Sequence, residues 1–168
     1  IEQIIILEVS GSKARAVTEP ENEKTLRGSK EGFIEDIWDN IALIRKTLSD
    51  PALKVEIFNL GRRTKTSLAV LYIGDLADEK LVNEVKKRIS RIDIDGVLAN
   101  GIIEAFIEDN PYSPFPQIQG TEKPDKVVAA LLEGRIAIIL DRTPFILLAP
   151  AQLIQFFQVP EDYYERLY

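Results

Sequence analysis

The sequence predicts one main domain of the α/β class, with α+β as the alternative, in which helices flank a mixed β-sheet. The first observation is size and composition, since 168 residues with 45% apolar and 29% charged side chains suffice to bury one proper core. The second is that apolar residues recur every three or four positions in some segments and form short unbroken runs in others. The third is the order of these segments, a helix, two strands, three helices and two strands, which is typical of a sheet with helices packed on it.

An amphipathic helix is the first element expected in this domain, beginning after Gly32. Asp50-Pro51 ends it, because proline disfavours a helical conformation at the residue before it. Strands are expected at 54–60 and 67–73, joined by a turn at 61–66. The second strand is apolar on both faces, which is typical of a strand inside a sheet covered on both sides. The apolar face of the helix consists of Ile34, Ile37, Trp38, Ile41, Ile44 and Leu48.

Three more helices and a second hairpin are expected after residue 73. Asp78 suits the N-cap of a helix, because its carboxylate can accept hydrogen bonds from the first turn. A short helix is expected after Asn100-Gly101, and the last helix is framed by Pro124 at its start and Gly134 at its end. The expected strands are a short one at 118–119 and a pair at 136–140 and 145–149, with a turn at 141–144.

Residues 1–28 are read separately from the main domain. Short apolar runs at 4–9 and 13–17 predict two strands. Two strands alone are unstable in water, so they form either an edge of the main sheet or the end of a preceding domain. We favour the second arrangement, with 1–28 as the terminal strands and linker of a truncated α/β subdomain and 29–168 as the main subdomain.

Composition excludes several classes of function. The chain has no cysteine and no histidine, which excludes disulfides, thiolate or imidazole metal sites, and every catalytic triad that uses histidine. The formal charge of −6 is opposite in sign to that of a nucleic-acid binder, so no nucleic-acid partner is expected. No glycine-rich phosphate loop is present, and no cofactor or metal is expected. The most apolar stretch, 136–157, is interrupted by charges and prolines, so we expect this segment to be soluble.

Two charged groups are candidate sites. Arg62, Arg63 and Lys65 stand together at a predicted tight turn, where guanidinium groups could hold a phosphate or carboxylate. The alternative is a solvated hairpin end or a salt-bridge partner for acidic side chains. Glu104 and Glu108 are four apart on a predicted helix, close enough to share a metal or to raise one pKa by repulsion. A solvated helix face is the favoured reading of this pair, and an all-carboxylate hydrolase is the least favoured function.

Two aromatic segments are candidate contact surfaces. The first is a loop rigidified by prolines, whose aromatic residues would serve as interface anchors or would plug the core of the domain itself. The second is the C-terminal segment, whose tyrosines suit a membrane surface or would pack back on the sheet. The loop candidates are Asn110, Pro111, Tyr112, Pro114 and Phe115, and the C-terminal candidates are Tyr163, Tyr164, Arg166 and Tyr168.

Several phrases together resemble one protein family. They are Gly28-Ser29-Lys30-Glu31-Gly32-Phe33, Asn40-Ile41-Ala42-Leu43-Ile44-Arg45, Gly61-Arg62-Arg63-Thr64-Lys65-Thr66, Ile92-Asp93-Ile94-Asp95-Gly96, the stretch from Ile107 to Gln117, and the stretch from Phe157 to Arg166. In this order they resemble the A subunits of spore germinant receptors, the GerA family. The chain departs from the family pattern at Ser29, where proline is frequent, and at Arg142, where glycine is common.

The resemblance implies a location and partners. It implies a hydrophilic region of two α/β subdomains on the cytoplasmic, or core, side of the spore inner membrane, ahead of membrane-spanning helices in the full-length protein. It also implies three kinds of partner: a B subunit that senses the nutrient, a lipoprotein C subunit, and other A subunits assembled into an ion channel. The family offers no catalytic residues to carry over. We therefore expect a non-enzymatic domain for subunit interaction and signal transmission, with a small-ligand-binding α/β domain as the alternative.

Overall fold

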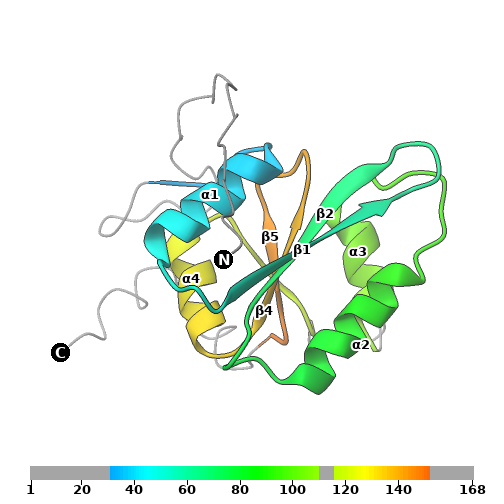
Figure 1. Ribbon diagram of the computed structural model, residues 1–168. Coiled ribbons are helices and arrows are strands. Elements are labelled where there is room, and N and C mark those ends of the chain that lie inside the picture. The colour runs from blue at the N-terminus through cyan, green and yellow to red at the C-terminus, as the bar shows by residue number, and fades with distance from the viewer. Residues whose placement is uncertain (1–30, 110–115, 152–168) are drawn as a thin grey trace, which may run out of the picture.

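A five-stranded antiparallel sheet with two helices on each face forms the domain (Figure 1). The computed structural model describes residues 31–109 and 116–151. The elements are α1 (Ile37–Thr47), β1 (Leu53–Leu60), β2 (Thr66–Ile73), α2 (Glu79–Ser90), α3 (Asn100–Ile107), β3 (Gln119–Thr121), α4 (Pro124–Leu132), β4 (Ile136–Leu140) and β5 (Ile146–Ala149). The strands predicted at 4–9 and 13–17, and with them the assignment of 1–28, lie outside the described residues.

The strand order is β1-β2-β4-β5-β3, and neighbouring strands are antiparallel throughout. The α/β class and the helix-flanked sheet are confirmed, while the expected mixed pairing is replaced by an antiparallel one. One reason is that β1–β2 and β4–β5 are hairpins, in which a short turn makes the two strands run in opposite directions. The connection through α2, α3, β3 and α4 then returns the chain so that Leu68 faces Leu140, with β4 also antiparallel to β2.

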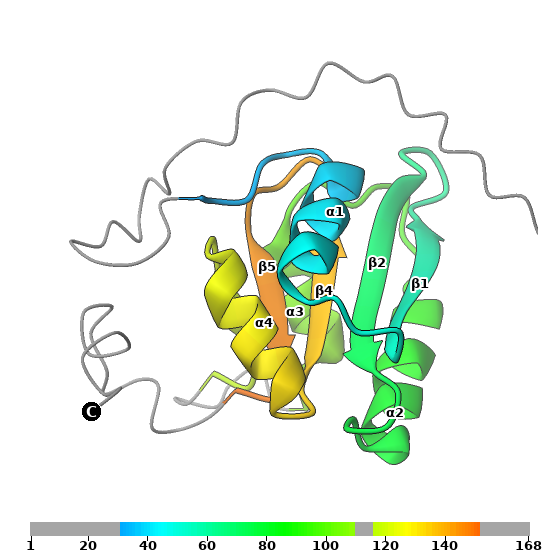
Figure 2. The same ribbon diagram turned by 60° about the vertical axis from the view of Figure 1, so that its left-hand side comes forward.

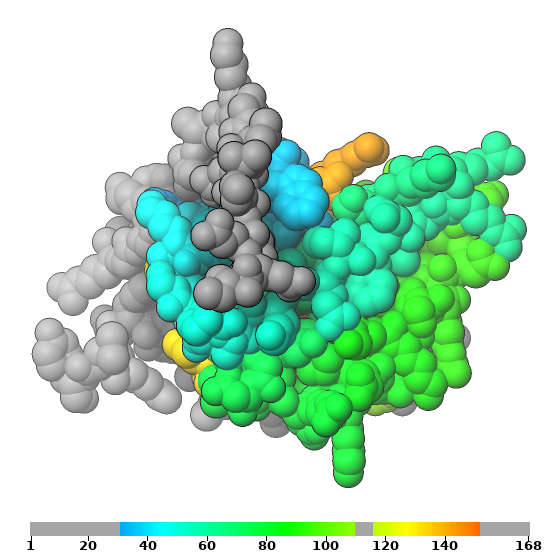
Figure 3. Space-filling view, in the orientation of Figure 1, coloured from blue at the N-terminus to red at the C-terminus, as the bar shows by residue number. Residues whose placement is uncertain are grey.

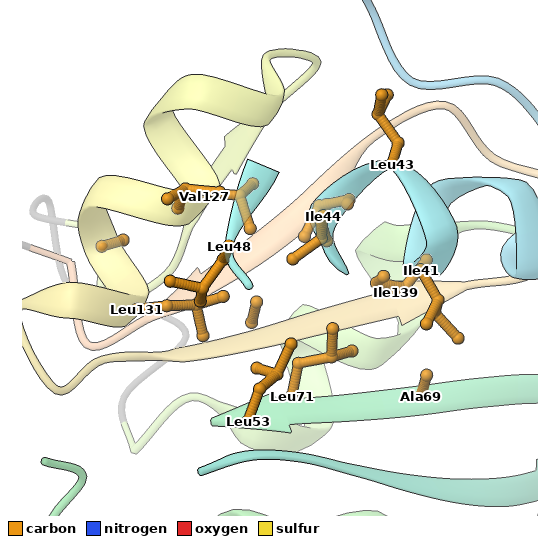
Figure 4. Packing of buried hydrophobic residues seen from close by; sticks show 14 of the residues in the cluster. Ile41, Leu43, Ile44, Leu48, Leu53, Ala69, Leu71, Val127, Leu131 and Ile139 are labelled. Atoms are coloured by element: carbon orange, nitrogen blue, oxygen red, sulfur yellow. The ribbon is translucent and has the colours of Figure 1, made fainter. Parts of the chain in front are cut away.

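Both faces of the sheet are buried against helices (Figure 2). Helices α1 and α4 pack on one face, where Ile44 and Leu131 lie over Leu71 and Ile139 (Figure 4). Helices α2 and α3 cover the other face, on which Val70 of the central strand β2 lies. Adjacent residues of a strand point to opposite faces, so Val70 and Leu71 enter different clusters, and neither is exposed at all. The prediction of a strand covered on both sides is confirmed.

The first helix begins later than its apolar pattern suggests. The Asp36 carboxylate caps α1 by accepting from the Trp38 and Asp39 N–H groups. The buried Asn40 side chain accepts at Oδ1 from the Ile34 N–H (2.9 Å) and donates from Nδ2 to the Ile34 carbonyl (2.6 Å). These two hydrogen bonds hold Ile34 in the segment ahead of the helix. Trp38, expected on the buried face, is 61% exposed because it lies on the flank of α1. The Asp78 cap is confirmed by its bond from the Lys80 N–H.

A polar cluster ties the edge strand β1 to β2 and α2. The Tyr72 hydroxyl donates to Glu56 Oε1 (2.7 Å), and the Lys86 ammonium lies 2.9 Å from the same oxygen. These hydrogen bonds, with that from Tyr72 the larger cause, lower the pKa of Glu56. The bond to Glu56, followed by burial, raises the pKa of Tyr72 to about 12. The cluster therefore stabilises β1 while Glu56 is ionised and Tyr72 is protonated.

We expect Tyr72→Phe to lower the free energy of unfolding by about 1 kcal/mol near pH 7, a value reduced by the partial exposure of Glu56. The raised pKa of Tyr72 makes its contribution complete below about pH 10 and lost as the pH rises through about 12. The lowered pKa of Glu56 makes its contribution complete above its ordinary value of 4.5 and lost as the pH falls through the folded-state value. Urea unfolding of both chains across pH measures the difference, and a difference independent of pH would contradict this assignment.

Candidate functional site

The turn between β1 and β2 packs against the segment between α2 and α3. The Arg62 N–H donates to the Ile94 carbonyl (2.9 Å), and the Arg63 N–H donates to the Asp95 carbonyl (2.9 Å). Two phrases that carry the family resemblance, 61–66 and 92–96, are thus brought together by backbone hydrogen bonds although about thirty residues separate them. This turn is consequently a fixed structure rather than a free hairpin end.

Glycine is required where the two segments approach each other. Gly61 has φ +86°, and a Cβ at this residue would lie 2.4 Å from Thr64 Oγ1 and 3.2 Å from the Gly96 Cα. A Cβ at Gly96 would lie 2.9 Å from Thr64 Cγ2. The 2.4 Å and 2.9 Å separations are shorter than real Cβ contacts, so the absence of side chains at these two residues permits the close packing of the turn.

Two threonines bond the turn to Val97. The buried Thr66 hydroxyl donates to the Val97 carbonyl (2.9 Å). The Thr64 hydroxyl oxygen accepts from the Val97 N–H (3.2 Å) and lies 3.0 Å from the Thr66 hydroxyl oxygen. Val97 is itself buried in the α2–α3 cluster, so these bonds connect the turn to the core.

The predicted cation group consists of three exposed residues, of which one forms an ion pair and two do not. Arg62 forms a two-point ion pair with Asp93, with Nε to Oδ1 at 2.7 Å and Nη2 to Oδ2 at 2.5 Å. This hydrogen-bonded contact lowers the pKa of Asp93 and raises that of Arg62. Arg62 is therefore the salt-bridge partner that one reading of the sequence expected. Among the described residues, the side chains of Arg63 and Lys65 have no hydrogen-bond or ion-pair partner and are exposed.

An exposed leucine lies beside these cations. Leu98 follows the anchored Val97 directly and is 75% exposed, more than any other large apolar residue of the described ranges. Arg63, Lys65 and Leu98 together form what we call the hairpin-end patch. Its charged and apolar side chains project from a backbone held by the turn bonds, so little backbone entropy is lost when a partner binds.

A second polar cluster closes the base of the proline loop. The Arg88 guanidinium bonds Glu84 (2.9 Å), the Ile107 carbonyl and the Asp109 carboxylate. The hydrogen bond to Glu84 and the further one to Asp109 raise the pKa of Arg88. The Asp109 N–H in turn donates to Gln117 Oε1 (2.7 Å), which joins the two sides of the loop. The candidate residues Asn110, Pro111, Tyr112, Pro114 and Phe115 lie outside the described residues, as do Tyr163, Tyr164, Arg166 and Tyr168.

One member of the glutamate pair, Glu104, lines an open pocket of about 300 Å³, whereas Glu108 does not. Glu104 lines this pocket with Asn100, Gly120, Arg142 and Leu147. Burial, and secondarily the charge of Glu108, raises the pKa of Glu104. No group of three or more potential metal ligands occurs among residues 31–109 and 116–151. The pocket is lined mainly by apolar surface, and its polar residues are Asn100, Glu104, Arg142 and Thr143.

The structure shows how the chain accommodates arginine at position 142, where glycine is common in the family pattern. Its φ is +70°, in the left-handed region that glycine adopts readily. The backbone N–H of Arg142 donates to the Glu35 carbonyl (2.7 Å), which holds the β4–β5 turn to the segment before α1. The turn therefore keeps a glycine-type conformation with arginine in that position, and the guanidinium projects into solvent at the pocket rim.

Comparison with known proteins decides the family. The family model for the Bacillus/Clostridium GerA spore germination protein matches residues 1–168. This chain belongs to the GerA spore germination family. In the part of this GerA chain that the structure describes, no helix has the length and apolar character needed to cross a bilayer.

Relatives of this GerA chain are known in sequence and in structure. It is 51% identical over 162 residues to the uncharacterized membrane protein YfkQ of Bacillus subtilis, covering 96% of this chain and 32% of YfkQ. It is 45% identical over 165 residues to spore germination protein KA of the same organism, covering 98% of this chain and 30% of that protein. The chain therefore spans about a third of the length of these relatives. The crystal structure of the N-terminal domain of the A subunit of the Bacillus megaterium germinant receptor GerK3 matches with a TM-score of 0.59 and 48% identity, covering 74% of this chain and 99% of that one.

Sequence reasoning identified the hairpin-end cations but missed what fixes them. Asp93 lies within the segment Ile92-Asp93-Ile94-Asp95-Gly96, but no local pattern marks it as the partner of Arg62, and none marks Arg88 as the partner of Asp109. The sequence segments that carry the family resemblance could have indicated these contacts. Segments 61–66 and 92–96 pack against each other, and Asp109 and Gln117, which are hydrogen-bonded, belong to a single segment.

We expect Gly61→Ala to destabilise the fold by about 1–3 kcal/mol, because alanine disfavours φ +86° and its Cβ would collide with Thr64. Gly101→Ala is the matched control, since a Cβ in helix α3 meets nothing within 4 Å and alanine favours the helix by roughly 0.5–1 kcal/mol. Urea unfolding of the two variants measures the contrast. Equal stability of both variants would contradict the close packing assigned to the turn.

Proposed function

We propose that this chain is the part of a spore germinant receptor A subunit that contacts other receptor subunits and transmits the nutrient signal to a membrane ion channel. The proposed partners are the B and C subunits and other A subunits, on the cytoplasmic side of the spore inner membrane. The full-length protein would be embedded in that membrane. Similarity to named spore germination proteins and to the N-terminal domain of a receptor A subunit supports this assignment.

The hairpin-end patch is the observation that carries the proposal. Arg63 and Lys65 have no partner among the described residues, yet hydrogen bonds fix the turn that presents them. A cation needed only for solubility gains nothing from so rigid a support, whereas a contact residue does. Transmission requires that a contact at the turn reaches the rest of the domain, and the bonds from Thr64 and Thr66 to the buried Val97 supply that connection.

Charge reversal at the patch tests the proposed function in spores that carry the full-length protein. We expect Arg63→Glu with Lys65→Glu to slow nutrient-triggered germination by roughly tenfold or more, because two like-charge contacts replace two attractive ones. The fall in optical density of a spore suspension after addition of nutrient measures the rate. Arg45→Glu on the exposed face of α1 is the control, and protein abundance is compared by immunoblot. Wild-type germination of the double variant at normal abundance would overturn the proposal.

Small-ligand binding is the second candidate function, and the pocket beside Glu104 favours it. The Glu104 carboxylate is half buried and has no hydrogen-bond partner among the described residues, so a ligand with a donor group would supply the missing hydrogen bond. Gly120 lines the same pocket, and a Cβ there would meet only Leu147 Cδ2 at 4.0 Å.

A thermal-shift screen with amino acids, sugars and nucleosides tests the second candidate. A ligand at a concentration of about 100 times its Kd is expected to add roughly 2.7 kcal/mol of stability to the wild type. Gly120→Leu would fill the pocket and abolish that shift, whereas Gly101→Ala would keep it. A flat screen of the wild type, or a shift that survives Gly120→Leu, would overturn ligand binding at this pocket.

A further inference from the structure

The pocket of about 300 Å³ lies between the start of α3, the β4–β5 turn and the strands β3 and β5. The Asn100 amide donates to the Phe145 carbonyl (2.9 Å), and the Thr143 hydroxyl lies 3.3 Å from Asn100 Oδ1. Gly120 and Leu147, which line another side, are paired in the sheet. Hydrogen bonds therefore join the walls to one another, so the pocket is formed before a ligand binds.

One half-buried polar group of the pocket has no partner in residues 31–109 and 116–151. The Thr143 hydroxyl lies within hydrogen-bond distance of the Leu140 carbonyl (3.1 Å) and the Phe145 carbonyl (3.4 Å), and the Asn100 amide is bonded at both its oxygen and its nitrogen. The Glu104 carboxylate, by contrast, makes no hydrogen bond or ion pair there. It is the group that a ligand would have to satisfy.

Acids outnumber bases on the segments that border the pocket. Arg142 is the base among the lining residues, yet its side chain is 71% exposed and its Nε lies 3.9 Å from Asp141 Oδ2. Glu108 lies one turn after Glu104, and the β4–β5 turn is bonded to the Glu35 carbonyl. The cations of the β1–β2 hairpin do not line the pocket. On the bordering segments the acids are Glu35, Asp36, Glu104, Glu108, Glu122 and Asp141, and the bases are Lys123 and Arg142.

The state of the Glu104 carboxyl agrees with this charge distribution. Burial, and secondarily the charge of Glu108, raises the pKa of Glu104. A raised pKa means that the surroundings disfavour the charged form of the carboxyl. A positive group at this place would offset both causes, because it supplies a charge-assisted hydrogen bond and weakens the repulsion from Glu108.

We propose that the pocket binds a small organic cation, with an ammonium group at the Glu104 carboxylate and a short apolar body against the walls. This proposal rests on ligand binding, the second function proposed above, and names the class of ligand. Pro144, Phe145 and Leu147 supply the apolar contacts. The aromatic ring of Phe145 adds to the preference, since the faces of aromatic rings attract cations.

Other ligand classes fit the pocket less well. A metal ion such as Ca²⁺ takes about six oxygen ligands or more, whereas no group of three or more potential metal ligands occurs in the described ranges. An anion would meet the Glu104 charge within mainly apolar surface, where repulsion is poorly screened. The volume corresponds to roughly ten water molecules at about 30 Å³ each, which limits the body of the ligand to a short chain or a single ring.

Three probes of the same shape and different charge test the proposal: n-pentylammonium, 1-pentanol and pentanoate. Each is titrated into the ¹⁵N-labelled chain, and amide chemical shifts report the affinity and the place of binding. We expect pentylammonium to shift the amides of Asn100, Gly120 and Leu147 and to bind about tenfold or more tightly than pentanol. Pentanoate should bind more weakly than either. Glu104→Gln, which keeps the shape of the side chain, should remove the advantage of pentylammonium over pentanol.

Three further variants separate the pocket charge from general effects. Glu79→Gln removes an exposed acid from the first turn of α2 and should leave the affinity for pentylammonium unchanged. Arg142→Gly removes the base at the rim, and glycine readily adopts the φ of +70° there, so pentylammonium should bind severalfold more tightly. Gly120→Leu should abolish binding of both pentylammonium and pentanol. The amide spectrum of each variant also shows whether it is folded.

The ligand class and the ligand-binding function fail separately. Equal affinity of the wild type for pentylammonium and pentanol, or an advantage of pentylammonium that survives Glu104→Gln, would overturn the organic cation. Binding of pentanol that Gly120→Leu abolishes would leave the pocket as a ligand site in that case. If none of the three probes binds and the screen of amino acids, sugars and nucleosides is also flat, both proposals are overturned.

Discussion

Burial of the sheet on both faces is the constraint on which the rest of the structure depends. The inner strands β2 and β4 are apolar at successive positions, as the fully buried neighbours Val70 and Leu71 show, so each face needs its own pair of helices. A strand that is apolar on both faces specifies its register weakly, because a slip by one residue exposes no polar group to the core. The register of β1 on β2 must therefore be determined by polar groups and by the turn.

The same polar groups that determine the register also support the hairpin-end patch, the contact surface that we propose. Gly61 and the hydroxyls of Thr64 and Thr66 fit only one arrangement of the turn against Val97, and Glu56 bonds Tyr72 only when the strands are paired as observed. A residue needed to align the hairpin is thus also needed to position Arg63 and Lys65. Under the proposed function, the threonine bonds to Val97 couple the stability of the domain to recognition at this end.

Elements with strong local signals were predictable from the sequence, whereas contacts between distant segments were not. Asp78, Pro124 and the apolar runs marked caps and strands that the structure confirms. The antiparallel pairing of β2 with β4 was not predictable, because direction depends on the whole connection between them and leaves no local pattern. The ion pair of Arg62 with Asp93 was hidden for the same reason, since 31 residues separate its members. Trp38 was expected on the buried face of α1 because helical periodicity does not distinguish the centre of an apolar face from its edge, and Trp38 lies at the edge.

Arg62 pairs with Asp93 and Arg63 does not, and this difference follows from the conformation of the turn. Successive residues of a tight turn point to different sides, so only one of two adjacent arginines reaches Asp93, and the other faces solvent. Figure 3 shows that the end of the β1–β2 hairpin projects at one side of the described surface. With helices over both faces of the sheet, its backbone is accessible only along its edges and at the strand ends. The ends are where connections bring side chains of several elements together, as Thr64, Val97 and Leu98 meet at one end and Leu76 and Gly134 at the other. A domain built in this way therefore brings side chains of several elements together at the two ends of its sheet, and the proposed contacts would form at one of them.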